Sequence, residues 1–270
     1  MTRAIDFYLP FRYLHRIRLK QWPKIISWWL LMILPTATYF LFFATNEWHY
    51  NILNYILLLL VVVMYYELGY IYNDTITTRS EEHPTMRLSA EALQYGRQHI
   101  GIIYLVRMLF VLSLMFVLGY INQWQEWIII TLIWVLLLQP IFMVYNTLRN
   151  QKAVFFYPIL VSWRYLSFIW VGIHQSCWAD ACFLLLLSYP LEISIERFSM
   201  PKRRMRWIRD ILPNENAKLW FRVLYYICAI CISAIMIWCK QLPIIWILPF
   251  VCLIIYRLLI WIHLSHKKNC

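Results

Sequence analysis

The sequence predicts an all-helical integral membrane protein, and three observations lead to this fold class. Hydrophobic residues make up 62% of the 270 residues and only 14% are charged, whereas a soluble domain carries about 25% charged residues. The mean hydropathy is +0.59. The apolar residues also gather in runs of about 20, the length that a helix needs to cross the hydrocarbon core of a bilayer. Lipid is therefore the expected solvent of this chain.

The apolar runs predict a polytopic bundle of about eight transmembrane helices, eight or nine, in a single domain that covers residues 1–270. Several neighbouring runs are separated by only a few residues, and such short connections make consecutive helices antiparallel. The predicted spans are 23–45, 50–72, 99–121, 124–147, 153–175, 178–197, 217–239 and 242–264.

The basic residues distinguish the two sides of the predicted bundle. With eight spans, the N-terminal segment, the C-terminus and the connections after the second, fourth and sixth spans fall on one side, and these parts are rich in Lys and Arg. The opposite connections hold Lys240 together with Glu47, Glu126 and Asp180. The positive-inside rule therefore places both termini in the cytoplasm. This topology accounts for the net charge of +12, so nucleic acid is not an expected partner.

Three cytoplasmic segments flank the predicted spans on this side. Residues 1–20 mix basic and apolar side chains. They form either an amphipathic helix in the membrane interface or a segment whose charges only set the topology. The connections 73–98 and 198–216 are the longest polar loops and are predicted to lie beside a candidate active site.

The connection 73–98 carries the first candidate site. Asn73 and Asp74 stand where the second apolar run ends, and a carboxylate at a membrane edge is costly unless it is solvated, paired or bound to a cation. Asn and Asp oxygens suit Mg²⁺, which takes one or two carboxylates and completes its coordination with water and substrate phosphates. Arg79 and Arg87 are candidates for binding further phosphate oxygens. The alternative is a solvated loop of mixed charge.

A second candidate site lies near the end of the sixth span. Glu192 and Glu196 are four residues apart, so they share one face of a helix and are candidates for holding a second cation. Alternatively, Glu196 pairs with Arg197 or Lys202. The basic run that includes Lys202 and Arg203 either binds phosphate or serves as a topology signal.

Arg107, Arg164 and Arg257 are three arginines inside the predicted spans. An intramembrane arginine usually faces the bundle interior or extends toward the interface. Arg164 is near the middle of its span and is expected to face a polar cavity, whereas Arg257 is close enough to its end to snorkel. Glu67, inside the second span, is a candidate ion-pair partner for one of the three.

Short motifs over residues 15–210 resemble the UbiA superfamily of intramembrane prenyltransferases. RLKQWPK at 18–24 resembles the Arg-Pro-x-Gln-Trp-x-Lys opening of that family. Asn73-Asp74 resembles the start of its Asn-Asp-x-x-Asp-x-x-x-Asp metal motif. This chain departs from that motif at two positions, because the second aspartate is replaced by Thr77 and the third by Glu81.

Two further motifs resemble the branch of this family that includes decaprenyl-phosphate phosphoribosyltransferase. HPTMR at 83–87 resembles its His-Pro-Thr-Lys-Arg sequence. YNTLR at 145–149 resembles Tyr-Ser-x-x-Leu-Lys, and Arg164 falls where that branch has a Leu-Arg-x-x-(Ala)-Gly segment.

The resemblance implies a Mg²⁺-dependent site at the cytoplasmic mouth of a helical cavity. It implies that the catalytic metal ligands are Asn73, Asp74 and Glu81, and that Glu192 and Glu196 serve a second metal. The substrate-binding residues that it implies are Lys24, His83, Arg87, Arg149, Arg164, Lys202 and Arg203.

The implied activity is transfer to or from a polyprenyl phosphate or prenyl diphosphate with release of pyrophosphate, in a bacterial inner membrane. Either a prenyl diphosphate alkylates an aromatic or other acceptor, or phosphoribosyl pyrophosphate reacts with a polyprenyl phosphate. HPTMR and the opening motif favour the second pair. Two other classes stay open, namely a catalytically degenerate relative that binds polyprenyl lipid, which Thr77 favours, and a small transporter.

Overall fold

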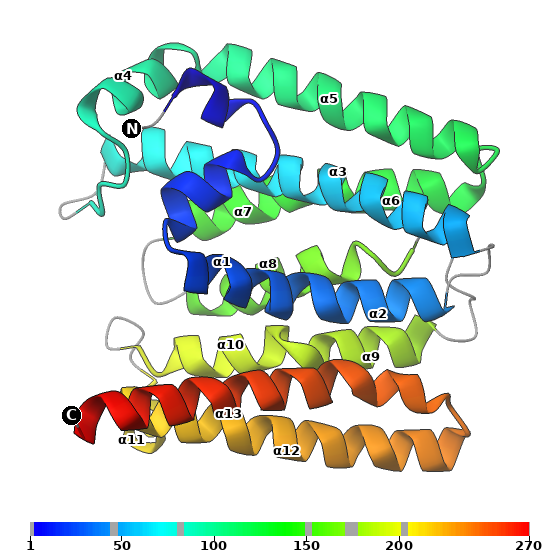
Figure 1. Ribbon diagram of the computed structural model, residues 1–270. Coiled ribbons are helices and arrows are strands. Elements are labelled where there is room, and N and C mark those ends of the chain that lie inside the picture. Colours follow the sequence, from blue (N-terminus) through cyan, green and yellow to red (C-terminus); the bar gives the residue numbers. More distant parts are fainter. Residues whose placement is uncertain are drawn as a thin grey trace.

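The computed structural model describes residues 3–43, 48–79, 84–148, 153–170, 178–200 and 205–269. Within these ranges it is all-helical and contains no strand, which confirms the predicted fold class. Long helices lie side by side, and the start and the end of the chain lie at the same end of the bundle (Figure 1). We call this the terminal end.

Six helical stretches in the described ranges are long and apolar enough to cross a membrane. They are Trp22–Phe42, Trp48–Arg79, Ile100–Ile121, Glu126–Thr147, Glu215–Lys240 and Ile244–His263. A seventh results if α9 (Trp178–Ser188) and α10 (Pro190–Phe198), which are bent by 41°, count as one broken span. The fifth predicted span, 153–175, contains α8 (Ala153–Leu166), and its last residues, 171–175, lie outside the described part of the chain.

The N-terminal segment is not one continuous amphipathic helix. It holds a short 3-10 helix, η1 (Ala4–Phe7), and a π-helix, η2 (Leu14–Leu19). Phe7, Tyr13 and Ile17 are buried against α3, α4 and α5, so the segment packs on the bundle. The chain then turns at Lys20, whose φ of 55° is left-handed, into the first span, which consists of α1 (Trp22–Trp28), η3 (Trp29–Ile33) and α2 (Leu34–Phe43).

The central helix of the bundle is α3 (Trp48–Thr75). Of its most apolar window, 78% is buried, against 22% for the peripheral α5 (Ile100–Ile121). The apolar residues of α3 are distributed around the helix instead of along one side, which suits such a position. Gly69 permits the close approach of α7 (Leu138–Thr147), because a Cβ there would lie 2.4 Å from the ring of Phe142.

The two predicted loops 73–98 and 198–216 contain short helices. The first holds η4 (Thr77–Arg79) and α4 (Ala90–Gln98), and the second holds α11 (Arg206–Ile211). Both lie at the terminal end (Figure 1). The last two long helices, α12 (Glu215–Lys240) and α13 (Leu248–Asn269), form a hairpin that is joined through η7 (Ile244–Ile247). Earlier in the chain, α6 (Glu126–Leu136) packs beside α7.

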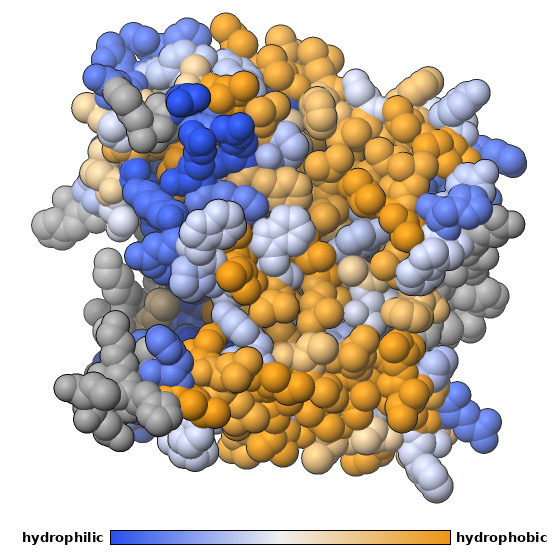
Figure 2. All heavy atoms as spheres, in the orientation of Figure 1, coloured by the Kyte–Doolittle hydropathy of each residue, from blue (hydrophilic) through white to orange (hydrophobic). Residues whose placement is uncertain are grey.

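The outer surface has the polarity expected of a protein in a bilayer. In Figure 2 the middle of the visible face is apolar, whereas hydrophilic side chains gather at both ends. Leu105 and Phe116 of α5 and Leu224 and Ile235 of α12 are among the large exposed apolar side chains. Together with the long apolar helices, this makes the chain an integral membrane protein. Its cytoplasmic orientation and its bacterial location stay predictions.

Candidate functional site

A cavity of about 1380 Å³ lies at the terminal end of the bundle. Side chains from η2, α1, α3, α7, α8, α10, α12 and α13 line it. Figure 2 shows the surface hollowed at this end, below the hydrophilic side chains of the N-terminal segment. Ordinary small-molecule pockets have volumes of about 300–1,000 Å³, so this cavity has room for more than one small ligand or for part of a long one.

The cavity is strongly cationic. Seven positively charged side chains line it, namely Arg18, Lys24, Arg87, Arg164, Arg197, Arg222 and Arg257. In the described ranges, three carboxylates form ion pairs with members of this set, namely Asp74, Glu192 and Glu196. Seven positive charges against three negative ones leave a surplus of four, which favours an anionic ligand.

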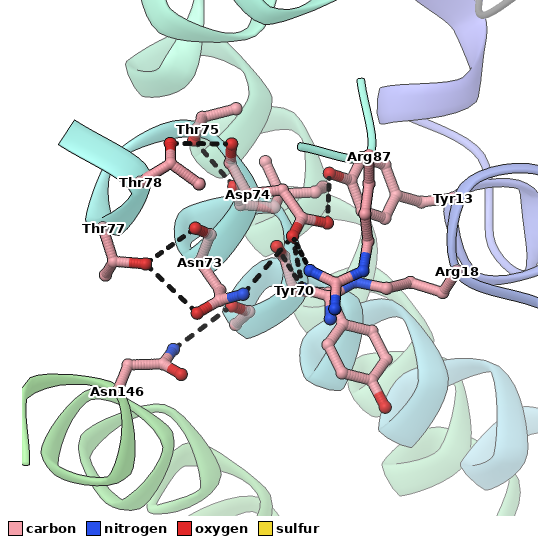
Figure 3. Close-up of polar contacts among 12 residues, drawn as sticks. Tyr13, Arg18, Tyr70, Asn73, Asp74, Thr75, Thr77, Thr78, Arg87 and Asn146 are labelled. Atoms are coloured by element: carbon pink, nitrogen blue, oxygen red, sulfur yellow. Dashed lines mark hydrogen bonds and ion pairs between the residues drawn. The ribbon is translucent and has the colours of Figure 1, made fainter. Parts of the chain in front are cut away.

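Asp74, at the end of α3, orients two of these arginines (Figure 3). Its Oδ1 accepts a hydrogen bond from Arg18 Nη2 at 2.8 Å and from Arg87 Nη1 at 3.1 Å. Its Oδ2 accepts from the Tyr13 hydroxyl at 3.0 Å. Burial, and then the adjacent carboxylate, hold the pKa of Tyr13 well above its usual range, so the phenol stays protonated and donates. Arg18 also lies over the ring of Tyr70, 4.3 Å from its centroid.

Asn73 and Thr77 are bound to each other beside Asp74 (Figure 3). The Thr77 hydroxyl donates to the Asn73 backbone oxygen at 2.7 Å and to Asn73 Oδ1 at 3.1 Å. Asn73 Nδ2 donates to Asp74 Oδ1 at 3.3 Å. Thr77, which was predicted to stand at the second aspartate position of the resembled motif, therefore contributes to the local hydrogen bonding at the end of α3 and carries no charge.

Glu192 and Glu196 form a second arginine cluster on the far side of the cavity. Arg257 Nη2 donates to Glu192 Oε1 at 2.8 Å. Arg222 binds both oxygens of Glu196, through Nε at 2.9 Å and Nη2 at 2.5 Å. Two expectations are thereby corrected: Arg257 does not snorkel, and Glu196 pairs with Arg222 instead of Arg197. The physical reason is that α12 packs against α10 and α13 packs against α12, which brings two arginines within reach. Lys202, the other predicted partner of Glu196, lies outside the described residues.

Arg164 and Arg197 line the cavity without a carboxylate partner in the described part of the chain. The guanidinium of Arg164 lies 4.5 Å from the ring centroid of Tyr66 and 5.6 Å from that of Tyr165. That of Arg197 lies 4.9 Å from the ring of Tyr157. Aromatic faces attract a guanidinium, but they do not neutralise its charge. The expectation that Arg164 faces a polar cavity is confirmed.

A third arginine–carboxylate cluster lies outside the cavity lining and is fully internal. Arg107 and Glu67 are buried and form an ion pair at 2.9 Å. All three guanidinium nitrogens donate, to Phe7 O, Leu9 O, Met64 O and Glu67 Oε2, while Glu67 Oε1 accepts from the Leu14 backbone. The prediction that Glu67 pairs with an intramembrane arginine is confirmed. The cluster fastens the N-terminal segment, and therefore Arg18, to α3 and α5.

The carboxylates among the predicted magnesium ligands that the structure describes are paired with arginines. No group of three or more His, Cys, Asp and Glu side chains in the described ranges is arranged to hold a metal ion. Asp74, Glu192 and Glu196 instead accept hydrogen bonds from arginines. Glu81, the third predicted ligand, lies outside the described residues. The magnesium requirement stays a prediction.

The structure brings together predicted site residues that are far apart in the sequence. Lys24, Asn73, Arg87, Arg164 and Glu196 line the one cavity, and Asp74 and Glu192 contact its arginines. The predicted residues that lie outside the described part of the chain are Glu81, His83, Arg149, Lys202 and Arg203.

Sequence reasoning did not assign a site role to four further lining residues, namely Arg18, Arg197, Arg222 and Arg257. Arg18 belongs to the opening motif, and its place in that motif could have identified it as a candidate site residue. Arg222 lies one third of the way along an apolar helix, and its charge within a predicted span was a signal of the same kind as for Arg164.

The fold and the cavity define the class of this protein: a polytopic helical membrane protein with an arginine-rich internal cavity at one end. No known protein family, no curated protein and no solved structure matches the chain. Membership of the UbiA superfamily therefore stays a prediction that rests on the sequence motifs.

Proposed function

We propose that this protein is a UbiA-like membrane transferase that binds phosphorylated substrates in the cationic cavity and releases pyrophosphate. The observation that supports this most strongly is Arg164. Its side chain is buried, with 7% of the residue exposed, lines the cavity and has no carboxylate partner among the described residues. Because an uncompensated charge inside a membrane-spanning bundle is unfavourable, an anionic ligand is the natural partner of this guanidinium.

The charge surplus favours the substrate pair in which both members are phosphorylated. In that pair, phosphoribosyl pyrophosphate is the donor and a polyprenyl phosphate of the membrane is the acceptor. The alternative pair, a prenyl diphosphate and an aromatic acceptor, places phosphate on one substrate only. Leu31, Met32 and Ile260 supply an apolar part of the lining, which suits the hydrocarbon chain of a polyprenyl lipid.

The proposed reaction is a substitution at the anomeric carbon of the donor. An oxygen of the polyprenyl phosphate forms a new C–O bond to this carbon, and the bond from the carbon to the pyrophosphate oxygen breaks. The pyrophosphate leaves with the bonding electron pair. The attacking phosphate oxygen is already ionised at neutral pH, so this step needs no general base.

The arginines would act by stabilising the negative charge that develops on the leaving pyrophosphate. Preoriented charged donors contribute in this way because they need no rearrangement during the reaction. Asp74 preorients Arg18 and Arg87 through the hydrogen bonds of Figure 3. Lys24, which is exposed on α1 at the cavity, is placed to contact a substrate phosphate as it enters.

The test is pyrophosphate release by the purified full-length protein in lipid nanodiscs, with each substrate pair and with either Mg²⁺ or EDTA. We expect release from phosphoribosyl pyrophosphate and a polyprenyl phosphate, and a decrease of at least about 100-fold in Asp74→Ala, because both arginines lose their orienting carboxylate. Lys240→Gln is the matched control, since it removes one ion pair, with Asp180, away from the cavity. Equal release by wild type and Asp74→Ala would contradict the assigned site.

A lipid-binding relative without catalysis is the second candidate. Thr77 supports it, because this residue binds Asn73 and adds no carboxylate at the end of α3. In that case polyprenyl phosphate would bind to folded protein, but no substrate pair would release pyrophosphate with or without Mg²⁺.

A further inference from the structure

On the wall of the cavity formed by α10, α12 and α13, buried carboxylates bind arginines of the lining, as Asp74 does on the other side. A buried carboxylate pair, Glu192 and Glu196, stands on one helix, and arginines from two later helices bind it. Glu192 is fully buried, and its Oε1 lies 2.8 Å from Arg257 and 3.7 Å from Arg222. The hairpin that supplies both arginines lies beyond residues 15–210, the part of the chain in which the motifs occur.

The two arginines retain hydrogen-bond donors that no described residue uses. A guanidinium has five N–H donors on three nitrogens. Arg222 binds the carboxylates through Nε and Nη2, which leaves Nη1. Arg257 binds Glu192 through Nη2, and its buried Nε has no hydrogen-bond partner in the described chain. Both side chains line the cavity, and the described chain saturates neither guanidinium.

The charge of this wall is also positive. Arg197, Arg222 and Arg257 face two carboxylates, and Arg164 of the adjacent α8 raises the surplus on this side from one to two. On the Asp74 side, Arg18, Lys24 and Arg87 face one carboxylate, which leaves the same surplus. In Figure 1 the elements of the two clusters, η2 and α3 against α10, α12 and α13, lie on different sides of α1 and α8. Each surplus matches one phosphate dianion.

We propose that the C-terminal hairpin forms a separate phosphate subsite, in which Arg222 and Arg257 bind the ligand and Glu192 and Glu196 are positioning residues, not metal ligands. This inference rests on the proposed function, since it divides the same cavity between two phosphorylated groups. A planar guanidinium held on one edge by a carboxylate presents its other edge in a fixed direction, which suits phosphate oxygens.

The test is calorimetric titration of the full-length protein in nanodiscs with inorganic pyrophosphate, in EDTA and in Mg²⁺. We expect wild type to bind in EDTA, and Arg222→Gln to bind about tenfold more weakly, the loss of a charge-assisted hydrogen bond. Glu196→Gln should weaken binding by the same factor in both buffers, because it releases Arg222 from its anchor. No binding by wild type in EDTA, or an Arg222→Gln affinity equal to that of wild type, would overturn the subsite.

Comparing the titrations in EDTA and in Mg²⁺ shows whether Glu196 positions Arg222 or coordinates a metal ion. If Glu196→Gln weakened binding only when Mg²⁺ is present, Glu196 would be a metal ligand and the assignment would be wrong. Arg257→Gln alone leaves Glu192 buried without its partner, so the double variant Glu192→Gln/Arg257→Gln is used and is expected to bind more weakly than wild type. Lys240→Gln is the control for a lost positive charge away from the cavity. Titration detects binding without turnover, so binding with no pyrophosphate release would refute the proposed transferase and leave the subsite standing.

Discussion

Arg107 and Arg164 are both buried inside the bundle, yet their surroundings differ in every respect that matters for function. Arg107 is fully buried, donates from all three guanidinium nitrogens and is neutralised by Glu67. Arg164 lies on two tyrosine rings, has no carboxylate partner in the described chain and has a buried Nε without a hydrogen bond. It also lines a cavity of about 1380 Å³.

The difference indicates that Arg107 stabilises the fold, whereas Arg164 is placed to bind a ligand. Removing one member of a satisfied buried pair is strongly destabilising, because the other charge is left uncompensated. A charge that is uncompensated in the protein itself already carries that penalty, and a ligand of opposite sign relieves it. Two buried arginines of one bundle therefore give opposite expectations for stability and for binding, and two experiments test them.

The largest expected effect is the loss of stability in Arg107→Met. This change leaves Glu67 buried and unpaired and removes the bonds that hold the N-terminal segment. We expect a decrease of about 3–5 kcal/mol in the free energy of unfolding, measured by denaturant titration in nanodiscs. The double variant Arg107→Met/Glu67→Gln should recover part of the loss, because no charge then stays buried. A loss below about 1 kcal/mol in the single variant would show that the pair is not architectural.

The second effect is a loss of binding without a loss of stability. Arg164→Met is expected to lower the affinity for inorganic pyrophosphate by about 10- to 100-fold, because a charged donor is lost from the cavity. Its free energy of unfolding should be equal to or above that of wild type, since an unpaired buried cation is removed.

Calorimetry and denaturant titration on the same preparation measure both quantities for Arg164. Arg164→Lys keeps the charge but loses the planar contact with the tyrosines, so we expect an intermediate affinity. If Arg164→Met were as unstable as Arg107→Met while binding pyrophosphate normally, the distinction between the two arginines would fail.

The smallest effect concerns the pH dependence of the N-terminal segment. His15 packs among Phe11, Trp28 and Trp29, and this burial lowers its pKa. The folded protein thus disfavours the imidazolium, whereas the unfolded chain protonates near about pH 6.5. The contribution of neutral His15 to stability is full above that pH and is lost as the pH falls through it toward the lowered folded value.

Thermal unfolding between about pH 7.5 and pH 5.5 measures this contribution. Wild type should lose more stability over this range than His15→Gln, which has no titrating ring. Identical pH profiles for the two proteins would mean that the docking of the segment is independent of His15.

The fold class was predictable because apolar runs of membrane-spanning length leave few alternatives for the backbone. The finer organisation was not. The predicted span 178–197 is broken between Ser188 and Pro190 by a 41° bend, and α3 is the central helix. Hydropathy is the same for a residue that faces lipid and for one that faces another helix, so it does not reveal which span is enclosed by the others.

The site was predictable only in part. Asn73, Arg87 and Arg164 were expected from motifs and from the cost of intramembrane charge, and all three line the cavity. The ion pairs could not be predicted from the sequence. Glu196 and Arg222 are 26 residues apart and Glu192 and Arg257 are 65 residues apart, and such separations leave no local sequence pattern. Sequence proximity suggested Arg197 or Lys202 as the partner of Glu196, whereas helix packing brings Arg222 to it.

The chain order of the second cluster has a consequence for biogenesis. Glu192 and Glu196 leave the ribosome before Arg222 and Arg257, the residues that neutralise them. Until α12 and α13 have been inserted, these two carboxylates have no arginine partners in the nascent bundle. Unpaired carboxylates are energetically unfavourable in a membrane. Completion of the cavity is thus tied to insertion of the last hairpin.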